Sequence, residues 1–283
     1  MKIVVAPDSF KGNMRSSRIC GIIKDAVLKE APSAEVQCCP MADGGEGTVD
    51  AVVSATGGTF QSLTVCGPLE NPVEARYGLL PDGTAIMEMA SASGIELVAH
   101  DQLNPLEATT YGTGEILRHL LETGHRHIVM GIGGSATVDG GTGMAQALGF
   151  RLLDSSGSEI EDRGGKILRH IHAVDGTGVC PALAEARIQV ACDVTNPLAG
   201  SNGAAAVFGP QKGATPGMVD ELDAGLRNLG AVLGTAEMPG DGAAGGLGYG
   251  LRAFCHAEII SGARLIADTV GLSDALVGAD LLI

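Results

Sequence analysis

The chain has 283 residues, of which 45% are hydrophobic and 18% are charged, and this composition indicates a folded globular protein rather than a disordered one. Its formal net charge of −15 disfavours nucleic acids and anionic membranes as partners, because an acidic chain repels both. No apolar run is long enough for a membrane-spanning helix, no signal-peptide pattern opens the chain, and the seven cysteines form no CxxC pair. We therefore expect a cytoplasmic protein with reduced thiols.

Alternating strands and helices are predicted for the first sixty residues. A short β-branched run at residues 2–6 is typical of a buried parallel strand. Isoleucines at helical spacing follow Ser16 and end before Pro32, and residues 36–40 predict a second strand. A second helix is predicted around Val52 and ends at a pair of glycines. This strand–helix–strand–helix order predicts a parallel sheet covered by helices.

The regular alternation weakens after about Leu63 and returns later in the chain. Turn signals rich in glycine and proline interrupt the intervening segment. The final apolar residues, 279–283, predict a strand that must pair with another strand to satisfy its backbone. The other elements predicted are a helix around 116–121, strands at 127–132 and 188–192, and a helix that begins at Thr215 and Pro216.

Four predicted strands end at a turn that is rich in glycine or proline and also carries an aspartate. Ligands of open α/β sheets bind beyond the carboxyl ends of the strands, where these side chains would lie. Aspartates there suit Mg²⁺, and glycine-rich turns suit phosphates because their backbone N–H groups are free. The turns together indicate phosphoryl transfer, in which positioning and charge neutralisation do most of the catalysis. The aspartates are Asp8, Asp43, Asp139 and Asp193, and a fifth turn places Lys212 just before a helix.

Simpler interpretations exist for each of these residues. An aspartate before two glycines is often only a turn former or a helix cap, and a lysine on a turn is often only solvated. Residues 131–136 also match the GxGxxA dinucleotide pattern, but Asp139 and two glycines interrupt the helix that this pattern requires. No GxxxxGK[ST] motif is present, which excludes a P-loop kinase. The histidines lack a cysteine or carboxylate at metal-ligand spacing.

Seven segments occur in the order and spacing of the bacterial glycerate kinases of the non-P-loop type, and the whole chain resembles that family. The segments read APDSFKG, PMADGGEGT, GTGE, GIGGSATVDGG, VACDVTNPL, FGPQKGAT and GAAGGLG. The resemblance implies phosphorylation of D-glycerate by ATP with Mg²⁺, usually on the 2-hydroxyl. It also implies a flavodoxin-like parallel α/β domain with a second α/β domain inserted into it, and a site in the cleft between them.

The chain departs from the family pattern at three places. The family usually has asparagine where Val138 stands, and alanine or glycine where Asp241 stands. It also continues beyond the strand that ends at Ile283, so the chain resembles a carboxyl-truncated member whose flavodoxin-like domain is incomplete. We accordingly predict this partial domain at residues 1–64 plus 279–283, and the inserted α/β domain at 65–278.

We also predict roles for individual residues of the matched segments. Asp43, Asp193, Lys11 and Lys212 are the predicted catalytic residues, and Asp43 and Asp193 are also the predicted Mg²⁺ ligands. The alternative is a truncated module that binds glycerate or a nucleotide without turnover. The unpaired outer edge of the last strand predicts low stability, aggregation or a homodimer. The predicted substrate- and phosphate-binding residues are Asp8, Ser9, Gly44, Gly45, Gly133, Gly134, Ser135, Asp139 and Asn196.

Overall fold

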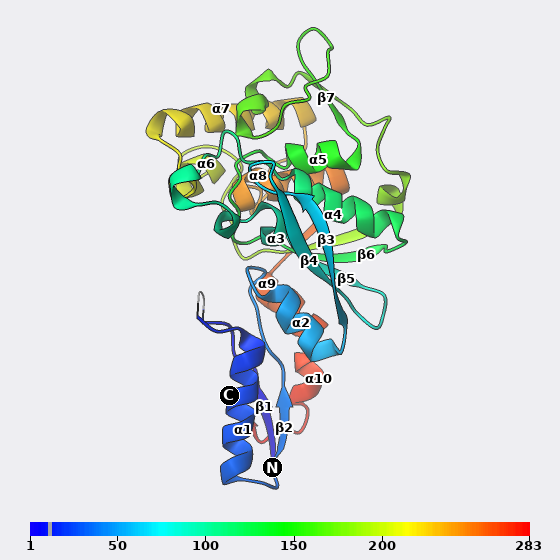
Figure 1. Ribbon diagram of the computed structural model, residues 1–283, viewed down its shortest axis with the longest axis vertical. Helices are drawn as coiled ribbons and strands as arrows, with labels where there is room; N and C mark the ends of the chain where they lie inside the picture. The colour runs from blue at the N-terminus through cyan, green and yellow to red at the C-terminus, as the bar shows by residue number, and fades with distance from the viewer. Residues whose placement is uncertain (11–12) are drawn as a thin grey trace.

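The computed structural model describes residues 1–10 and 13–283 and has a mixed α/β architecture in an elongated molecule (Figure 1). A small parallel sheet lies with helix α1 at one end, and a larger sheet lies with most of the helices at the other. Within these described ranges, no helix is long and apolar enough to cross a membrane. The strands are β1 Lys2–Val5, β2 Glu35–Cys38, β3 Thr59–Cys66, β4 Pro72–Leu79, β5 Ala85–Glu88, β6 His127–Gly131, β7 Arg151–Leu153, β8 Ala173–Asp175, β9 Arg187–Ala191, β10 Glu258–Ile260 and β11 Leu281–Leu282. The α-helices are α1 Ser16–Glu30, α2 Thr48–Thr56, α3 Ala90–Ser93, α4 Tyr111–Glu122, α5 Thr142–Leu148, α6 Ala204–Phe208, α7 Pro216–Leu233, α8 Ala243–Cys255, α9 Gly262–Thr269 and α10 Leu272–Leu276.

The small sheet joins the two ends of the chain. Its strand order is β11-β1-β2, and both pairings are parallel, so that Ile3 pairs with Leu281 on one side and Val36 on the other. Ile3 packs against Cys20 of α1, and Val4 packs on the opposite face against α10. The predicted pairing of the last strand with the first is confirmed. The order also agrees with the first three strands of the flavodoxin-like arrangement.

The large sheet has the order β10-β9-β6-β5-β4-β3, and it is parallel from β10 to β5 and antiparallel from β5 to β3. Strands β3, β4 and β5 were not predicted from the sequence, although turn signals in the sequence mark their hairpin loops. Gly67 N donates to Asn71 O between β3 and β4, and Gly83 N donates to Leu80 O between β4 and β5. Most of β3 is exposed, so it lacks the apolar alternation by which a strand is recognised in a sequence.

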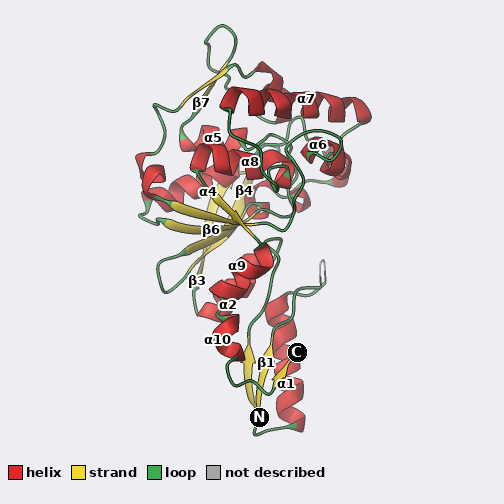
Figure 2. Ribbon diagram, turned by 180° about the vertical axis from the view of Figure 1, so that it is seen from behind, coloured by secondary structure: helices red, strands yellow, loops and turns green. Residues whose placement is uncertain are grey.

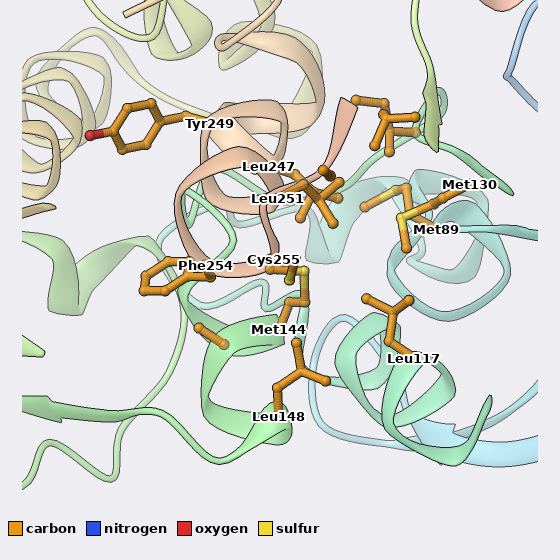
Figure 3. Packing of buried hydrophobic residues seen from close by; sticks show 14 of the residues in the cluster. Met89, Leu117, Met130, Met144, Leu148, Leu247, Tyr249, Leu251, Phe254 and Cys255 are labelled. Carbon is orange, nitrogen blue, oxygen red and sulfur yellow. The ribbon is translucent and has the colours of Figure 1, made fainter. Parts of the chain in front are cut away.

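Helices cover both faces of the large sheet, so its central strands are buried on both sides (Figure 2). Side chains of a strand point alternately to its two faces. Along β6, Ile128 and Met130 face the main hydrophobic cluster with α4, α5 and α8, whereas Val129 faces α2 and α9. Figure 3 shows Met130 in the main cluster beside Met89, with Met144 of α5 nearby.

Helix α2 connects the two sheets. It follows β2 of the small sheet in the chain, yet its valines pack on the large sheet together with α9. Residue 64, the predicted domain boundary, lies inside β3 of the large sheet. The division into residues 1–64 plus 279–283 and residues 65–278 stays a prediction.

The two substitutions that set the chain apart from the family pattern lie in the interior. Val138 is fully buried in the main hydrophobic cluster. Asp241 is also fully buried, just before α8, and Arg252 Nη1 donates to both of its carboxylate oxygens, at 2.6 and 2.8 Å. Met238 N donates to the same carboxylate at 2.6 Å. The charge at Asp241 is therefore paired inside the protein.

Removing the arginine of this pair should destabilise the fold. Arg252→Met leaves the buried Asp241 carboxylate without its counter-ion, and we expect the free energy of unfolding to fall by about 3–5 kcal/mol. Arg227→Met is the matched control, because the Arg227–Asp223 pair is exposed on its arginine side and should contribute less than about 1 kcal/mol. Urea unfolding at pH 7 measures both. Equal losses in the two variants would contradict the assignment.

Candidate functional site

A cavity of about 840 Å³ opens at the carboxyl ends of β6 and β9. Loop 132–135 and the end of β9 with residues 192–194 form one wall, and loop 43–47 with residues 9–10 and 13–15 forms another. The remaining wall comes from residues near Lys212 and from the start of α8. This is the edge of a parallel sheet at which ligands of α/β proteins bind.

Eight of the predicted site residues line this cavity. They are Ser9, Asp43, Gly45, Gly133, Gly134, Ser135, Asp193 and Lys212. Four others, Asp8, Gly44, Asp139 and Asn196, do not line it. The remaining predicted residue, Lys11, lies outside the described residues.

Two glycine loops meet backbone to backbone at the floor of the cavity. Gly133 N donates to Gly44 O at 3.1 Å. A Cβ atom on Gly44 would lie 2.4 Å from Ala191 O, and one on Gly133 would lie 2.7 Å from the Cα of Gly45. Any side chain at either position would separate the loops. Gly44 therefore allows its loop to pack against the end of β9, while Asp43 and Gly45 on either side of it line the cavity.

Asp43 lies at the start of loop 43–47. Its Oδ1 accepts a hydrogen bond from Gly45 N at 2.9 Å, which holds the turn. Asp43 O and Asp193 Oδ2 both lie beside Gly262, because a Cβ atom there would be 2.3 Å from the first and 3.1 Å from the second. The two predicted metal ligands are thus brought to the same place from β9 and from the loop after β2.

Asp193 also caps helix α9. Its Oδ1 accepts hydrogen bonds from Ser261 Oγ at 2.8 Å and Gly262 N at 3.1 Å, and its Oδ2 accepts one from Ala263 N at 3.3 Å. A carboxylate has about four acceptor positions, so these bonds leave capacity for a ligand. Across the described residues, no group of three or more His, Cys, Asp or Glu side chains is arranged to hold a metal ion on its own.

Lys212 is almost completely buried, although it lines the cavity. Its Nζ donates to Ser135 Oγ at 2.6 Å and to Thr137 O at 2.7 Å. Burial lowers the pKa of Lys212 to about 7, although the nearby Asp139 carboxylate opposes this shift. The amine is therefore linked to the cavity through the hydroxyl of Ser135, and near pH 7 it exists in both protonation states.

Asp139 organises the loop before α5. It is fully buried, and its oxygens accept hydrogen bonds from Thr110 N and Oγ1, both at 2.8 Å, from Gly141 N at 3.1 Å and from Gly143 N at 3.3 Å. Burial raises the pKa of this carboxyl. The hydrogen bonds occupy its acceptor positions within the protein.

Two other predicted residues also form internal contacts beside the cavity. Asn196 Nδ2 donates to Asn202 O, and Asn196 O accepts from Gly242 N. Asp8 Oδ1 accepts a hydrogen bond from Ser9 N at 2.6 Å. In these contacts, each residue fixes a turn next to the cavity.

Several residues that line the cavity were not predicted from the sequence. Arg15, just before α1, donates to Asp50 of α2 at 3.1 Å and so joins the starts of these two helices. Ala244 adopts a left-handed conformation with φ of 52°, which is costly for a residue with a Cβ atom, and two left-handed glycines follow it. The segment GAAGGLG marked this turn, but not its place at the cavity. The other unpredicted residues are Phe10, Asn13, Met14, Glu46, Gly47, Ile95, Glu96, Ile132, Ala191, Cys192, Val194, Phe208, Gln211 and Ala243.

Comparison with known proteins adds independent information. A model of the glycerate kinase family matches residues 3–283. The chain is 45% identical to the glycerate 2-kinase of Escherichia coli strain K12 and 45% identical to the glycerate kinase of Bacillus subtilis strain 168. In each case the match covers 100% of this chain and 76% of the relative.

A solved structure agrees with these matches. The crystal structure of a putative glycerate kinase 2 from Salmonella typhimurium LT2 superposes with a TM-score of 0.93 at 47% sequence identity, over 100% of this chain and 77% of the other. The family match spans nearly the whole chain, and the strands, helices and glycine loops described above are those of the same fold. The chain belongs to the glycerate kinase family.

Proposed function

We propose that the protein transfers a phosphoryl group from ATP to D-glycerate, with Mg²⁺ as the required ion and 2-phosphoglycerate as the favoured product. The observation that carries this proposal is the cavity at the strand ends, where two aspartates, a buried lysine and two glycine loops converge. The family assignment supports the reaction class, and the name of the Escherichia coli relative supports the position of transfer.

The aspartates of the cavity suit a magnesium–nucleotide complex. Mg²⁺ usually takes one or two protein carboxylates and completes its coordination with phosphate oxygens and water, so a larger protein cluster is not needed. Asp43 and Asp193 would hold the ion, since both line the cavity and the backbone oxygen of Asp43 lies on the same side as the Asp193 carboxylate, next to Gly262. When bound, the ion would supply charge neutralisation for the transferred phosphoryl group.

The glycine loop after β6 suits the phosphates. Gly133, Gly134 and Ser135 line the cavity with small side chains, so a polyanion can approach their backbone. Lys212 holds the Ser135 hydroxyl in place through the hydrogen bond of 2.6 Å. We assign Lys212 the role of orienting this hydroxyl and of supplying positive charge behind it when protonated.

A binding module without turnover is the second candidate. The chain spans about three quarters of the length of the curated relatives that it matches. Such a module would keep the contacts of loops 43–47 and 132–135 with a nucleotide or with glycerate. Turnover separates the two candidates.

The first functional prediction concerns substrate and cofactor. The chain should form ADP from ATP only when both Mg²⁺ and D-glycerate are present, and calorimetry should detect binding of Mg-ATP but not of NAD. A coupled assay measures the formation of ADP, and NMR of the product identifies which hydroxyl of glycerate is phosphorylated. Ligand binding without ADP formation would favour the binding module, and tight NAD binding without ATP binding would exclude the kinase.

The second functional prediction concerns the two aspartates. Asp43→Asn and Asp193→Asn should each lower kcat/KM for glycerate by about 10² or more, the usual contribution of a general base or a comparable catalytic group. Asp154→Asn is the matched control, because Asp154 also accepts a hydrogen bond from a backbone N–H two residues further on, but in an exposed turn away from the cavity. Unchanged kcat/KM in either cavity variant would remove that residue from the site.

The third functional prediction concerns the stability contributed by Lys212. Its folded-state pKa of about 7 lies below the ordinary value of 10.5, so the unfolded chain binds more protons between these two pH values. In the wild type this group therefore makes the free energy of unfolding rise from pH 7 to pH 10. Lys212→Met should lose this rise, which unfolding by urea at several pH values measures. An identical pH dependence in both proteins would contradict the buried position of the amine.

A further inference from the structure

Glu88 is a buried carboxylate for which the proposed reaction has no role so far. It is the last residue of β5, its side chain is 8% exposed, and it does not line the cavity. Its Oε1 accepts a hydrogen bond from Val49 N, in the first turn of α2, at 2.7 Å. The contact therefore joins the large sheet to the beginning of a helix that comes from elsewhere in the chain.

The helix that Glu88 contacts continues directly from loop 43–47. Gly47 is the N-cap residue of α2 and, being glycine, offers no side chain for capping. Gly45, Glu46 and Gly47 line the cavity immediately before this helix. Glu88 thus supplies from the sheet the acceptor that the helix lacks, and a negative charge at this position also interacts favourably with the helix dipole.

Two charged groups face Glu88 from neighbouring elements. The pKa of Glu88 is raised to about 7, chiefly by burial and in part by the charge of Glu46, against the opposing effects of hydrogen bonds from Val49 and Gly47 and of the charge of Arg15. Asp50, in the first turn of α2, is paired with Arg15. Near neutral pH, Glu88 therefore changes between an ionised and a neutral form while it remains in contact with the loop.

We propose that Glu88 is a positioning residue, whose buried carboxylate holds loop 43–47 at the cavity, and that the loop loosens when this carboxylate is protonated. The ionised carboxylate accepts the hydrogen bond from Val49 N at the start of α2, and its negative charge strengthens this bond. The protonated carboxyl is a weaker hydrogen-bond acceptor, and its O–H group needs an acceptor in this buried place. This inference rests on the proposed function for its catalytic consequence, but not for the order of the loop.

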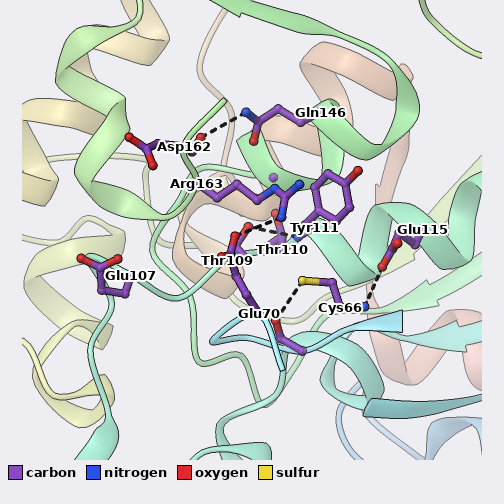
Figure 4. A network of polar contacts seen from close by, with 12 residues as sticks. Cys66, Glu70, Glu107, Thr109, Thr110, Tyr111, Glu115, Gln146, Asp162 and Arg163 are labelled. Atoms are coloured by element: carbon purple, nitrogen blue, oxygen red, sulfur yellow. Dashed lines mark hydrogen bonds and ion pairs between the residues drawn. The ribbon is translucent and has the colours of Figure 1, made fainter. Parts of the chain in front are cut away.

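Hydrogen exchange tests the order of the loop without any turnover. We compare the wild type with Glu88→Gln, which keeps an acceptor but cannot ionise. The matched control is Glu115→Gln, because Glu115 Oε2 likewise accepts a hydrogen bond from a backbone N–H, that of Cys66, at 2.6 Å (Figure 4). After correction for the intrinsic rate, protection of residues 44–50 should rise from pH 6 to pH 8 in the wild type and in the control, but not in Glu88→Gln.

Kinetics tests the consequence for the site. The ratio of kcat/KM in the wild type to that in Glu88→Gln should be near one at pH 6 and about tenfold at pH 8, because a displaced loop misplaces the groups that it carries. Lys212 also has a pKa of about 7, but it is present in both proteins, so its effect on kcat/KM cancels in this ratio. A wild type that binds Mg-ATP without turnover would overturn the proposed function alone, and the Kd for Mg-ATP then replaces kcat/KM in the ratio.

Two results would overturn the role of Glu88. One is protection of residues 44–50 in Glu88→Gln that rises with pH as in the wild type. The other is a ratio that stays constant between pH 6 and pH 8, which would show that Glu88 has only a structural role. Because glutamine keeps the size and one acceptor of the glutamate, a folded variant is expected, and its thermal unfolding is recorded beside that of Glu115→Gln.

Discussion

The site depends on a contact between two backbones that leaves no room for side chains. Gly44 and Gly133 approach each other so closely that the loop after β2 and the loop after β6 share a hydrogen bond. The first loop comes from the small sheet and the second from the large one. This contact therefore brings Asp43 to the end of β9, where Asp193 lies, and so defines the cavity that both aspartates line.

Around this contact, carboxylates also fix the starts of helices and loops. Asp193 accepts hydrogen bonds from the start of α9, Glu88 from the start of α2, and Asp139 from the loop that leads into α5. In each case an acidic side chain satisfies backbone N–H groups that a helix or loop leaves without partners. The excess of acidic residues is thus partly explained by internal structure. Of these three carboxylates, Asp193 itself lines the cavity, and Glu88 contacts the helix that follows loop 43–47.

Local signals made much of the fold predictable. Thr215 caps α7 as its sequence indicates, and glycine ends α2, since capping depends on neighbours in the chain. The turn between β3 and β4 carries a glycine signal, but most of β3 is exposed and shows no apolar alternation, so these strands were missed. Among site residues, Ser135 and Asp43 belong to recognisable motifs. Glu88 was missed because its partner lies 39 residues away, and the burial of Lys212 depends on contacts 77 residues distant.

The pairing of β1 with β11 has a consequence for how the protein is made. Asp280 accepts a hydrogen bond from Lys2 N across 278 positions of sequence. Ribosomes add about 5–20 residues per second, so β1 emerges on the order of 15 to 60 seconds before β11, its second partner strand. During that interval the edge of β1 is an open template for another strand. Strand β2 pairs only with the opposite edge of β1, so in a nascent chain this edge stays open until synthesis reaches β11, unless a chaperone covers it.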